Sequence, residues 1–335
     1  MHPALSVIFF TVVSGTGYGL LFLIGILLAI DPAACDPVVA LLSIGSGGVL
    51  AAAGLTSSTL HLGRPLRAWR AFSQWRSSWL SREGVAALLC FVPIVVLGVL
   101  AWQQRYAPAA GEPAAGAALA MRATGAVLAL AAFATVFCTA RIYSSLKTIA
   151  AWHNGYVLPG YLLLGLVGGA LTLSTIRALA GGNCAPWLQP GVPLLVAATA
   201  IAAAWLKHAY WRFIDSSTPP STSASATGLG RFGTVRGVEA PHTEPNYLTH
   251  EMGFVVARKH SARLRRIAVL AFAAAPVTLV VIAALQPSSR AAAFCSIVAL
   301  LAGTIGIFVE RWLFFAEAKH VVMLYYAGTR GSIEE

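Results

Sequence analysis

Residues 5–30 read LSVIFFTVVSGTGYGLLFLIGILLAI, a run without one charged side chain. A helix needs about 20 apolar residues to cross the hydrocarbon core of a bilayer, so this stretch alone predicts a membrane span. Seven further stretches of the sequence have the same character. We expect eight spans, near residues 5–30, 38–60, 84–103, 117–139, 158–180, 191–209, 267–286 and 291–314.

The composition of the whole chain agrees with that pattern. The 335 residues are 58% hydrophobic and only 10% charged, whereas soluble domains are about 25% charged. Backbone groups cannot remain unpaired in lipid, and the short alternating segments of a β-barrel are absent. We therefore expect an all-α integral membrane protein with a single membrane domain, residues 1–335, built as a bundle of eight transmembrane helices.

Basic residues gather in the loops between spans two and three, four and five, and six and seven. The loop of about residues 61–83 carries five arginines, and the loop before it carries none. Because basic loops stay in the cytoplasm, we place these three loops on the cytoplasmic side of a bacterial inner membrane. We expect both termini in the periplasm. The net charge of +11 suits anionic lipid or an acidic protein partner, and we expect no nucleic-acid partner.

The segment of about residues 210–266 is the longest polar stretch, and it is too short for a core of its own. We interpret it as a cytoplasmic loop that orders against a partner protein. The residues that we assign to partner docking are Arg67, Arg70, Arg258 and Lys259.

The five cysteines follow no metal-binding spacing. No CxxC motif occurs, so we expect neither an iron–sulfur cluster nor a cysteine-rich metal site. Cys35 and Cys184 fall in loops on the expected outer side, where the compartment is oxidising. A disulfide between them is our prediction, and two unrelated thiols are the alternative.

Ionisable side chains collect at the ends of the predicted spans. Proton and ion pathways usually carry such groups at mid-depth, so this pattern argues against a pump. No histidine lies in the middle of a span, and no pair is placed to hold a haem. We expect no haem, no iron–sulfur cluster and no molybdenum in this protein.

A candidate site lies at the cytoplasmic edge of the membrane. His61 follows the second span and Glu83 precedes the third, so the two side chains can be neighbours. An imidazole exchanges protons near neutral pH, and a carboxylate at the membrane edge is partly desolvated. The pair suits quinone chemistry, which moves protons with electrons, and Arg64, Arg82 and Tyr143 would add donors to a quinone oxygen. The alternative is a helix cap at His61 and a helix-dipole partner at Glu83.

Several separated motifs resemble the membrane anchor subunit of the dimethyl sulfoxide reductase family, over essentially the whole sequence. They are HLGRP at 61–65, WLSRE at 79–83, ARIY at 140–143, NYL at 246–248, EMGF at 251–254, ARKH at 257–260 and ERWLFFAEA at 310–318.

The resemblance implies a membrane-bound member of a three-part complex. One partner, the catalytic subunit, then carries a molybdenum cofactor, an iron–sulfur subunit is the second partner, and the anchor exchanges electrons with quinone or quinol. The family has a His at the end of the second span and a Glu at the start of the third in quinol binding, which match His61 and Glu83. The first ten residues and the long loop resemble the sulfite dehydrogenase branch of the family. A small-molecule transporter and a purely structural anchor are the alternative functions.

Overall fold

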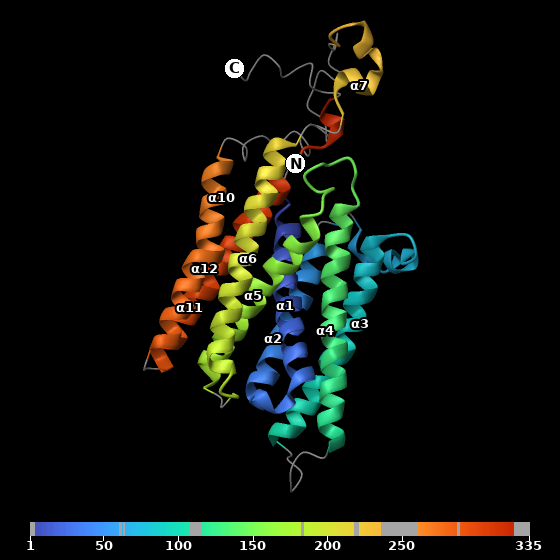
Figure 1. Ribbon diagram of the computed structural model, residues 1–335. Coiled ribbons are helices and arrows are strands. Elements are labelled where there is room, and N and C mark those ends of the chain that lie inside the picture. The colour runs from blue at the N-terminus through green and yellow to red at the C-terminus, as the bar shows by residue number, and fades with distance from the viewer. Residues whose placement is uncertain are drawn as a thin grey trace.

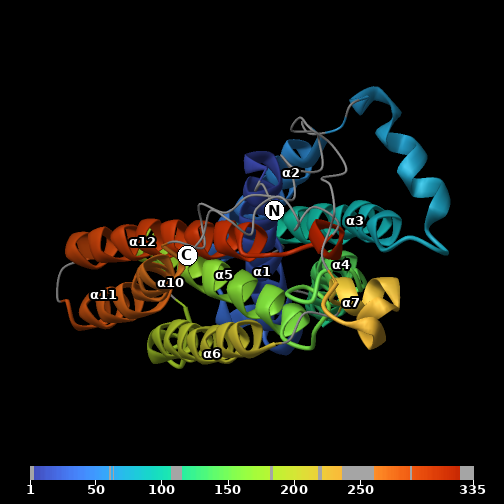
Figure 2. The same cartoon turned by 90° about the horizontal axis from the view of Figure 1, so that it is seen from above.

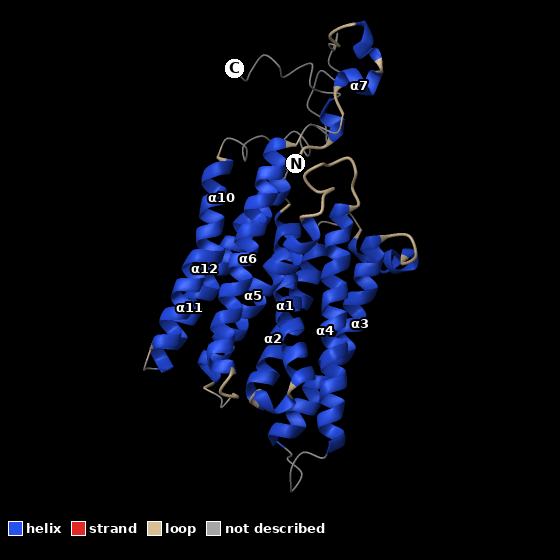
Figure 3. Ribbon diagram, in the orientation of Figure 1, coloured by secondary structure: helices blue, strands red, loops and turns tan. Residues whose placement is uncertain are grey.

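The computed structural model describes residues 4–59, 62, 64–106, 115–181, 184–217, 221–235, 260–286 and 289–324. Its long helices run up and down side by side (Figure 1), and no strand occurs within these described ranges (Figure 3). Eight helical stretches are long and apolar enough to cross a membrane, so the predicted fold class is confirmed. The spans are α1 (Leu5–Ile30), α2 (Pro37–Thr59), α3 (Trp79–Tyr106), α4 (Ala115–Ser144), α5 (Val157–Ala180), α6 (Leu188–Ser216), a composite seventh span and α12 (Ser289–Ala316).

Some helices extend beyond the boundaries that hydropathy predicts. The helix α3 begins at Trp79 rather than near residue 84, and α6 continues to Ser216 rather than 209. Hydropathy falls where charged residues occur, but the helical backbone hydrogen bonds continue past these residues. Long basic side chains at the ends of a span extend toward water. The predicted loop of 210–266 is correspondingly shorter at both ends, and it contains α7 (Ser223–Thr227) and η3 (Leu229–Phe232).

The seventh span changes its helical winding part of the way along. It consists of α10 (Ser261–Val269), a π-helical turn η4 (Leu270–Ala274) and α11 (Ala275–Leu285). Pro276 has no backbone N–H to continue the regular hydrogen-bond ladder, and π-turns accommodate such an interruption inside a helix. The backbone of α12 approaches this turn closely, because a Cβ on Gly306 would overlap the backbone of Phe272.

The helix α1 is the centre of the bundle. It packs against α2, α4, α5 and α12, and the view from above places α2 to α4 on one side of α1 and α5, and α6 with α10 to α12 on the other (Figure 2). Glycines allow these contacts: a Cβ on Gly25 would lie 2.8 Å from the carbonyl oxygen of Gly125. Small residues let helix backbones approach closely where lipid supplies no hydrophobic drive between helices.

The described residues before α1 and after α12 lie at the same end of the bundle as the end of α2 and the loop between α4 and α5. Ser57 near the end of α2 donates a hydrogen bond to the Ser6 carbonyl at the start of α1 (3.1 Å). After α12, the Val321 N–H donates to the carbonyl of Thr148 in the loop between α4 and α5 (3.1 Å). We call this the basic end: it is where α1 begins and α2 ends.

This arrangement corrects part of the expected topology. An even number of antiparallel spans returns the chain to the side on which it started, and every second loop lies on that side. Basic loops in the cytoplasm and termini in the periplasm are therefore incompatible, and the predicted placement of the termini opposite the basic loops was wrong.

Cys35 and Cys184 meet at the opposite end of the bundle. Cys35 follows the short helix η1 (Pro32–Ala34) after α1, and the Ala185 N–H donates to the Ala34 carbonyl (2.9 Å). The two thiols are unlinked here but close enough for a hydrogen bond, and burial is the main cause that raises the pKa of Cys35 to about 12. Cys184 is partly exposed, so it is the thiol that an oxidant reaches first.

We expect Cys35 and Cys184 to form a disulfide in membranes of cells with an oxidising periplasm. Both thiols are oxidised, and their two electrons and two protons pass to a periplasmic thiol–disulfide oxidoreductase in its disulfide form. Peptide mapping without reductant should recover the linked peptides, and Cys184→Ser should abolish them while Cys90→Ser leaves them intact. Quantitative alkylation of both cysteines in freshly isolated membranes would contradict the prediction.

Candidate functional site

Glu83 is a buried carboxylate with little to compensate its charge. It lies in the second turn of α3 and is 4% exposed, and it accepts a hydrogen bond from the Thr139 hydroxyl of α4. Among the described residues, no cation forms an ion pair with it. Burying an unpaired carboxylate costs several kcal/mol, and intramembrane carboxylates commonly mark functional sites.

Not every residue predicted around Glu83 turns toward it. Arg82 donates to the carbonyls of Trp75 (2.9 Å) and Arg76 (2.6 Å), and its guanidinium lies 4.4 Å from the Trp79 ring centroid. Arg64 is exposed at the start of the loop helix η2 (Pro65–Gln74). Both arginines therefore belong to the loop surface rather than to the pocket of Glu83.

Three predicted residues lie outside the part of the sequence that the structure describes: His61, Arg258 and Lys259. The described part of α2 ends at Thr59, two residues before His61 in the sequence, and α2 packs against α3. The pairing of His61 with Glu83 stays a prediction.

Tyr143 lies one helical turn beyond Thr139 on α4, inside an aromatic cluster. Its ring stacks on Tyr161 of α5, with centroids 5.6 Å apart, and meets Trp152 edge-on at 5.3 Å. Phe314 and Phe315 of α12 complete the cluster. Edge-to-face and offset aromatic pairs add stabilisation beyond the area they bury, so this cluster holds α4, α5 and α12 together beside Glu83.

A second buried polar group connects α6 and α12. Lys207 of α6 forms an ion pair with Glu310 of α12, and Arg311 binds the same carboxylate at 2.5 and 3.0 Å. All three residues are at most 3% exposed. Sequence analysis missed this cluster, although Lys207 falls within the expected span 191–209. The signal was present, because Glu310 and Arg311 lie within the expected span 291–314.

A further ion bridge lies nearer the surface of the basic end. Arg265 of α10 binds Asp215 of α6 at 2.6 and 2.9 Å and Glu317 at 3.0 Å. Burial raises the pKa of Glu317, although Arg265 opposes the shift. This bridge fixes the segment after α12 against the ends of α6 and α10.

Tyr18 of α1 was also missed. It is 2% exposed, its hydroxyl has no hydrogen-bond partner among the described residues, and it lies within electrostatic range of Glu83. A tyrosine between Gly17 and Gly19 in a span without charged residues was the signal that could have found it. Within the described residues, no three His, Cys, Asp or Glu side chains come together as metal ligands.

Fold and site together define an all-helical membrane protein with a buried carboxylate near one end of the bundle. The protein belongs to the DMSO reductase anchor subunit (DmsC) family, whose model matches residues 1–316. It is 32% identical to a sulfite dehydrogenase subunit of Allochromatium vinosum over 97% of this chain and 99% of that protein. It is also 26% identical to a subunit of the anaerobic dimethyl sulfoxide reductase of Escherichia coli, over 44% of this chain and 48% of that protein. The resemblance inferred from the motifs is confirmed.

Glu310 should be the most sensitive member of the buried ion cluster. Glu310→Gln leaves Lys207 and Arg311 as two buried cations without a carboxylate, and breaking a buried pair in this way costs about 3–5 kcal/mol. Lys207→Met leaves the neutral Glu310–Arg311 pair and should cost clearly less. Thermal unfolding in detergent, followed by tryptophan fluorescence, compares the two variants. Equal melting temperatures for Glu310→Gln and the unmodified protein would contradict this assignment.

Proposed function

We propose that this protein is the quinone-reactive anchor of a membrane-bound molybdenum enzyme complex. In this proposal it lies in the bacterial cytoplasmic membrane with its basic end facing the cytoplasm, so that the termini are cytoplasmic as well. The observation that carries the proposal is Glu83, a carboxylate that is buried near the start of α3 without an ion-pair partner among the described residues. Family membership supports the role of anchor.

The chemistry of the site follows from what a quinone takes up when it is reduced to a quinol, two electrons and two protons. Glu83 takes or returns a proton at a carboxylate oxygen, and the Thr139 hydroxyl orients that carboxylate by its hydrogen bond. His61, which follows α2 in the sequence, is proposed to connect Glu83 with the water at the basic end. Because Glu83 is only 4% exposed, bulk water is excluded from it, and proton exchange remains coupled to the bound quinone.

The electrons are proposed to pass from a molybdopterin catalytic subunit to an iron–sulfur subunit docked at the basic end, and from there to the quinone. The helix η2 extends away from the bundle (Figure 2) and carries the exposed Arg67 and Arg70. Phe72 anchors η2 to α3, since a Cβ on Gly84 would lie 2.7 Å from its ring. A projecting basic surface of this kind favours an acidic partner and accelerates its association.

Sulfite is the substrate that we propose for the assembled complex. The sulfite dehydrogenase relative is similar over 97% of this chain, whereas the dimethyl sulfoxide reductase relative is similar over 44%. Electrons would then run from sulfite through the complex to quinone.

Glu83→Gln should lower quinone reduction by sulfite about 100-fold or more, because general acid–base groups contribute about 10²–10⁴ in rate. Sulfite oxidation with a water-soluble electron acceptor should continue, since that assay bypasses the anchor. Asp36→Asn, at the opposite end of the bundle, is the matched control and should behave as the unmodified complex. Unchanged quinone reduction in Glu83→Gln would overturn the proposed role.

His61→Ala should show the same separation of activities in an assembled complex. We expect quinone reduction to be lost while sulfite oxidation with the water-soluble electron acceptor is retained, because only the route of the proton is interrupted. Co-purification with both partner subunits establishes that the variant assembles. Normal quinone turnover in this variant would remove His61 from the proton route while leaving Glu83 in place.

A further inference from the structure

The loop helix η2 separates its apolar and basic side chains into two straight rows. A 3₁₀-helix has about three residues per turn, so side chains three positions apart lie in line along it. The apolar row consists of Leu66, Trp69, Phe72 and Trp75. The basic row, one position further along, consists of Arg67, Arg70, Ser73 and Arg76. Trp75 directly follows η2 and keeps 3₁₀ dihedral angles (φ −59°, ψ −23°), so it continues the apolar row.

This separation depends on the 3₁₀ winding. An α-helix turns by about 100° per residue, which would put Leu66 and Trp75 on opposite faces. With about 120° per residue they share one face. The 3₁₀ stretch has ten residues, whereas such stretches rarely exceed about three to four residues. The winding that η2 adopts is therefore the one that gives an unbroken apolar stripe.

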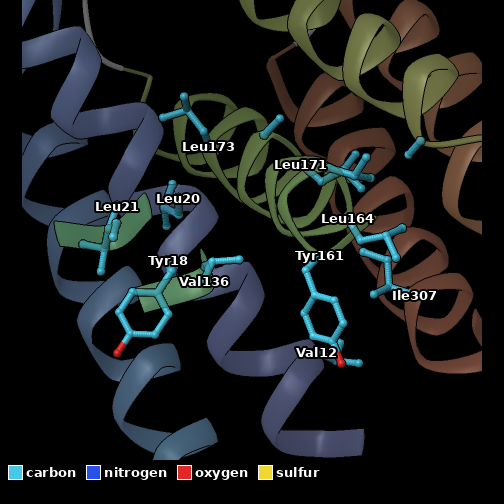
Figure 4. Packing of buried hydrophobic residues seen from close by; sticks show 14 of the residues in the cluster. Val12, Tyr18, Leu20, Leu21, Val136, Tyr161, Leu164, Leu171, Leu173 and Ile307 are labelled. Carbon is cyan, nitrogen blue, oxygen red and sulfur yellow. The ribbon is translucent and has the colours of Figure 1, made fainter. Parts of the chain in front are cut away.

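Most of the apolar row is exposed. Leu66 is 93% exposed, Trp69 66% and Trp75 53%. Large apolar side chains of the spans, such as Leu20 and Leu171, instead pack between the helices in the interior of the bundle (Figure 4). Exposed apolar side chains that gather on one face mark an interaction surface.

Phe72 fixes the depth of η2 along the bundle. It is half-buried and touches α3 at Gly84. Leu88, an exposed residue of the apolar part of α3, lies one turn further into the span, about 6 Å away at ~1.5 Å per residue. The axis of η2 runs across the spans, because η2 occupies a narrow band beside α3 in Figure 1 and is seen lengthwise in Figure 2. Its apolar row therefore lies at the level where the span enters the hydrocarbon.

Hydrogen bonds hold η2 in this position. The Ser81 hydroxyl donates to the carbonyl of Ala71. Arg82 donates to the carbonyls of Trp75 and Arg76, at the end of η2. Because Ser81 and Arg82 belong to the first turn of α3, the direction of the apolar row is set by the span.

We propose that η2 is an interfacial element whose apolar row enters the phospholipid bilayer beside α3. Leu66, Trp69 and Trp75 occupy the boundary between headgroups and acyl chains, the level at which tryptophan is enriched and amphipathic helices bury their apolar face. The basic row lies at the level of the lipid phosphates, which arginine binds through charge-assisted hydrogen bonds. This role goes beyond the proposed function and does not depend on quinone chemistry.

Insertion of the apolar row leaves the basic row at the membrane surface. The two rows point about 120° apart, so arginine side chains stay among the headgroups when the tryptophans enter the lipid. Arg67 and Arg70 therefore remain accessible to the partner subunit proposed above.

The test places a photoreactive diazirine analogue of leucine at position 66 of the complete complex, in nanodiscs of phosphatidylcholine and phosphatidylglycerol in equal parts. Illumination should give phospholipid adducts, which mass spectrometry identifies. The same analogue at Leu88, on the exposed side of α3, is the positive control. At Ser73, on the basic row, it should give few acyl-chain adducts.

Two double variants give a second measurement. Trp69→Ser with Trp75→Ser should lower the lipid adducts at position 66 severalfold, because interfacial binding follows the apolar area that is buried. Ala68→Ser with Ala71→Ser places the same two serines outside both rows and should leave the adducts unchanged. Co-purification of the partner subunits shows that each variant assembles. If the analogue prevents assembly, a phospholipid with a photoreactive acyl chain should label Trp69 or Trp75 in the unmodified complex.

Two results would overturn the inference. Adducts at position 66 with a partner subunit in place of lipid would assign the apolar row to a protein interface. Reaction with water alone at position 66, while position 88 labels lipid, would place η2 outside the bilayer. Quinone turnover in Glu83→Gln is measured separately, so failure of the proposed function is distinguishable from failure of this role.

Discussion

The contact of helix backbones around α1 is the constraint on which the rest of the structure depends. Lipid tails are as apolar as leucine side chains, so apolarity alone cannot hold one transmembrane helix against another. Close packing does so here, because glycines on α1 meet glycines on α4 and α5 and the helix surfaces interlock.

A buried ion cluster provides a second set of stabilising contacts and connects α6 with α12. The cluster of Lys207, Glu310 and Arg311 carries two cations and one carboxylate, away from water. Its neighbours are aromatic: the Lys207 ammonium lies 3.9 Å from the Tyr210 ring centroid, and the Arg311 guanidinium lies 4.4 Å from that of Tyr161. Aromatic faces stabilise cations most where water is excluded, so the rings accommodate the excess positive charge that Glu310 does not balance.

Sequence reasoning reached the features that depend on local composition. Eight apolar runs predict eight spans, and the position of Glu83 next to a span marks it as a candidate because a membrane edge is costly for a charge. Sequence reasoning did not predict the features that depend on which helices pack against each other. Tyr18 and Lys207 are visible in the sequence as polar side chains within expected spans, but their neighbours are not. Glu83 comes near Tyr18 from α3, and Glu310 is brought beside Lys207 from more than a hundred residues away. The number of spans and the rule for basic loops were applied correctly. The error lay in the alternation of the eight spans between the two sides of the membrane, which puts the termini on the same side as the basic loops.

The pairing of Lys207 with Glu310 also has a consequence for how the protein is made. Synthesis proceeds from the N-terminus, so α6 enters the bilayer before the ribosome has translated α12. A lysine within a span costs about 2.5–3.5 kcal/mol to insert when it is central, and for that interval Lys207 has no carboxylate to neutralise it. The last span thus completes the insertion of an earlier one, and a polypeptide that terminates before it would expose an unpaired cation to the proteases that remove unfinished membrane proteins.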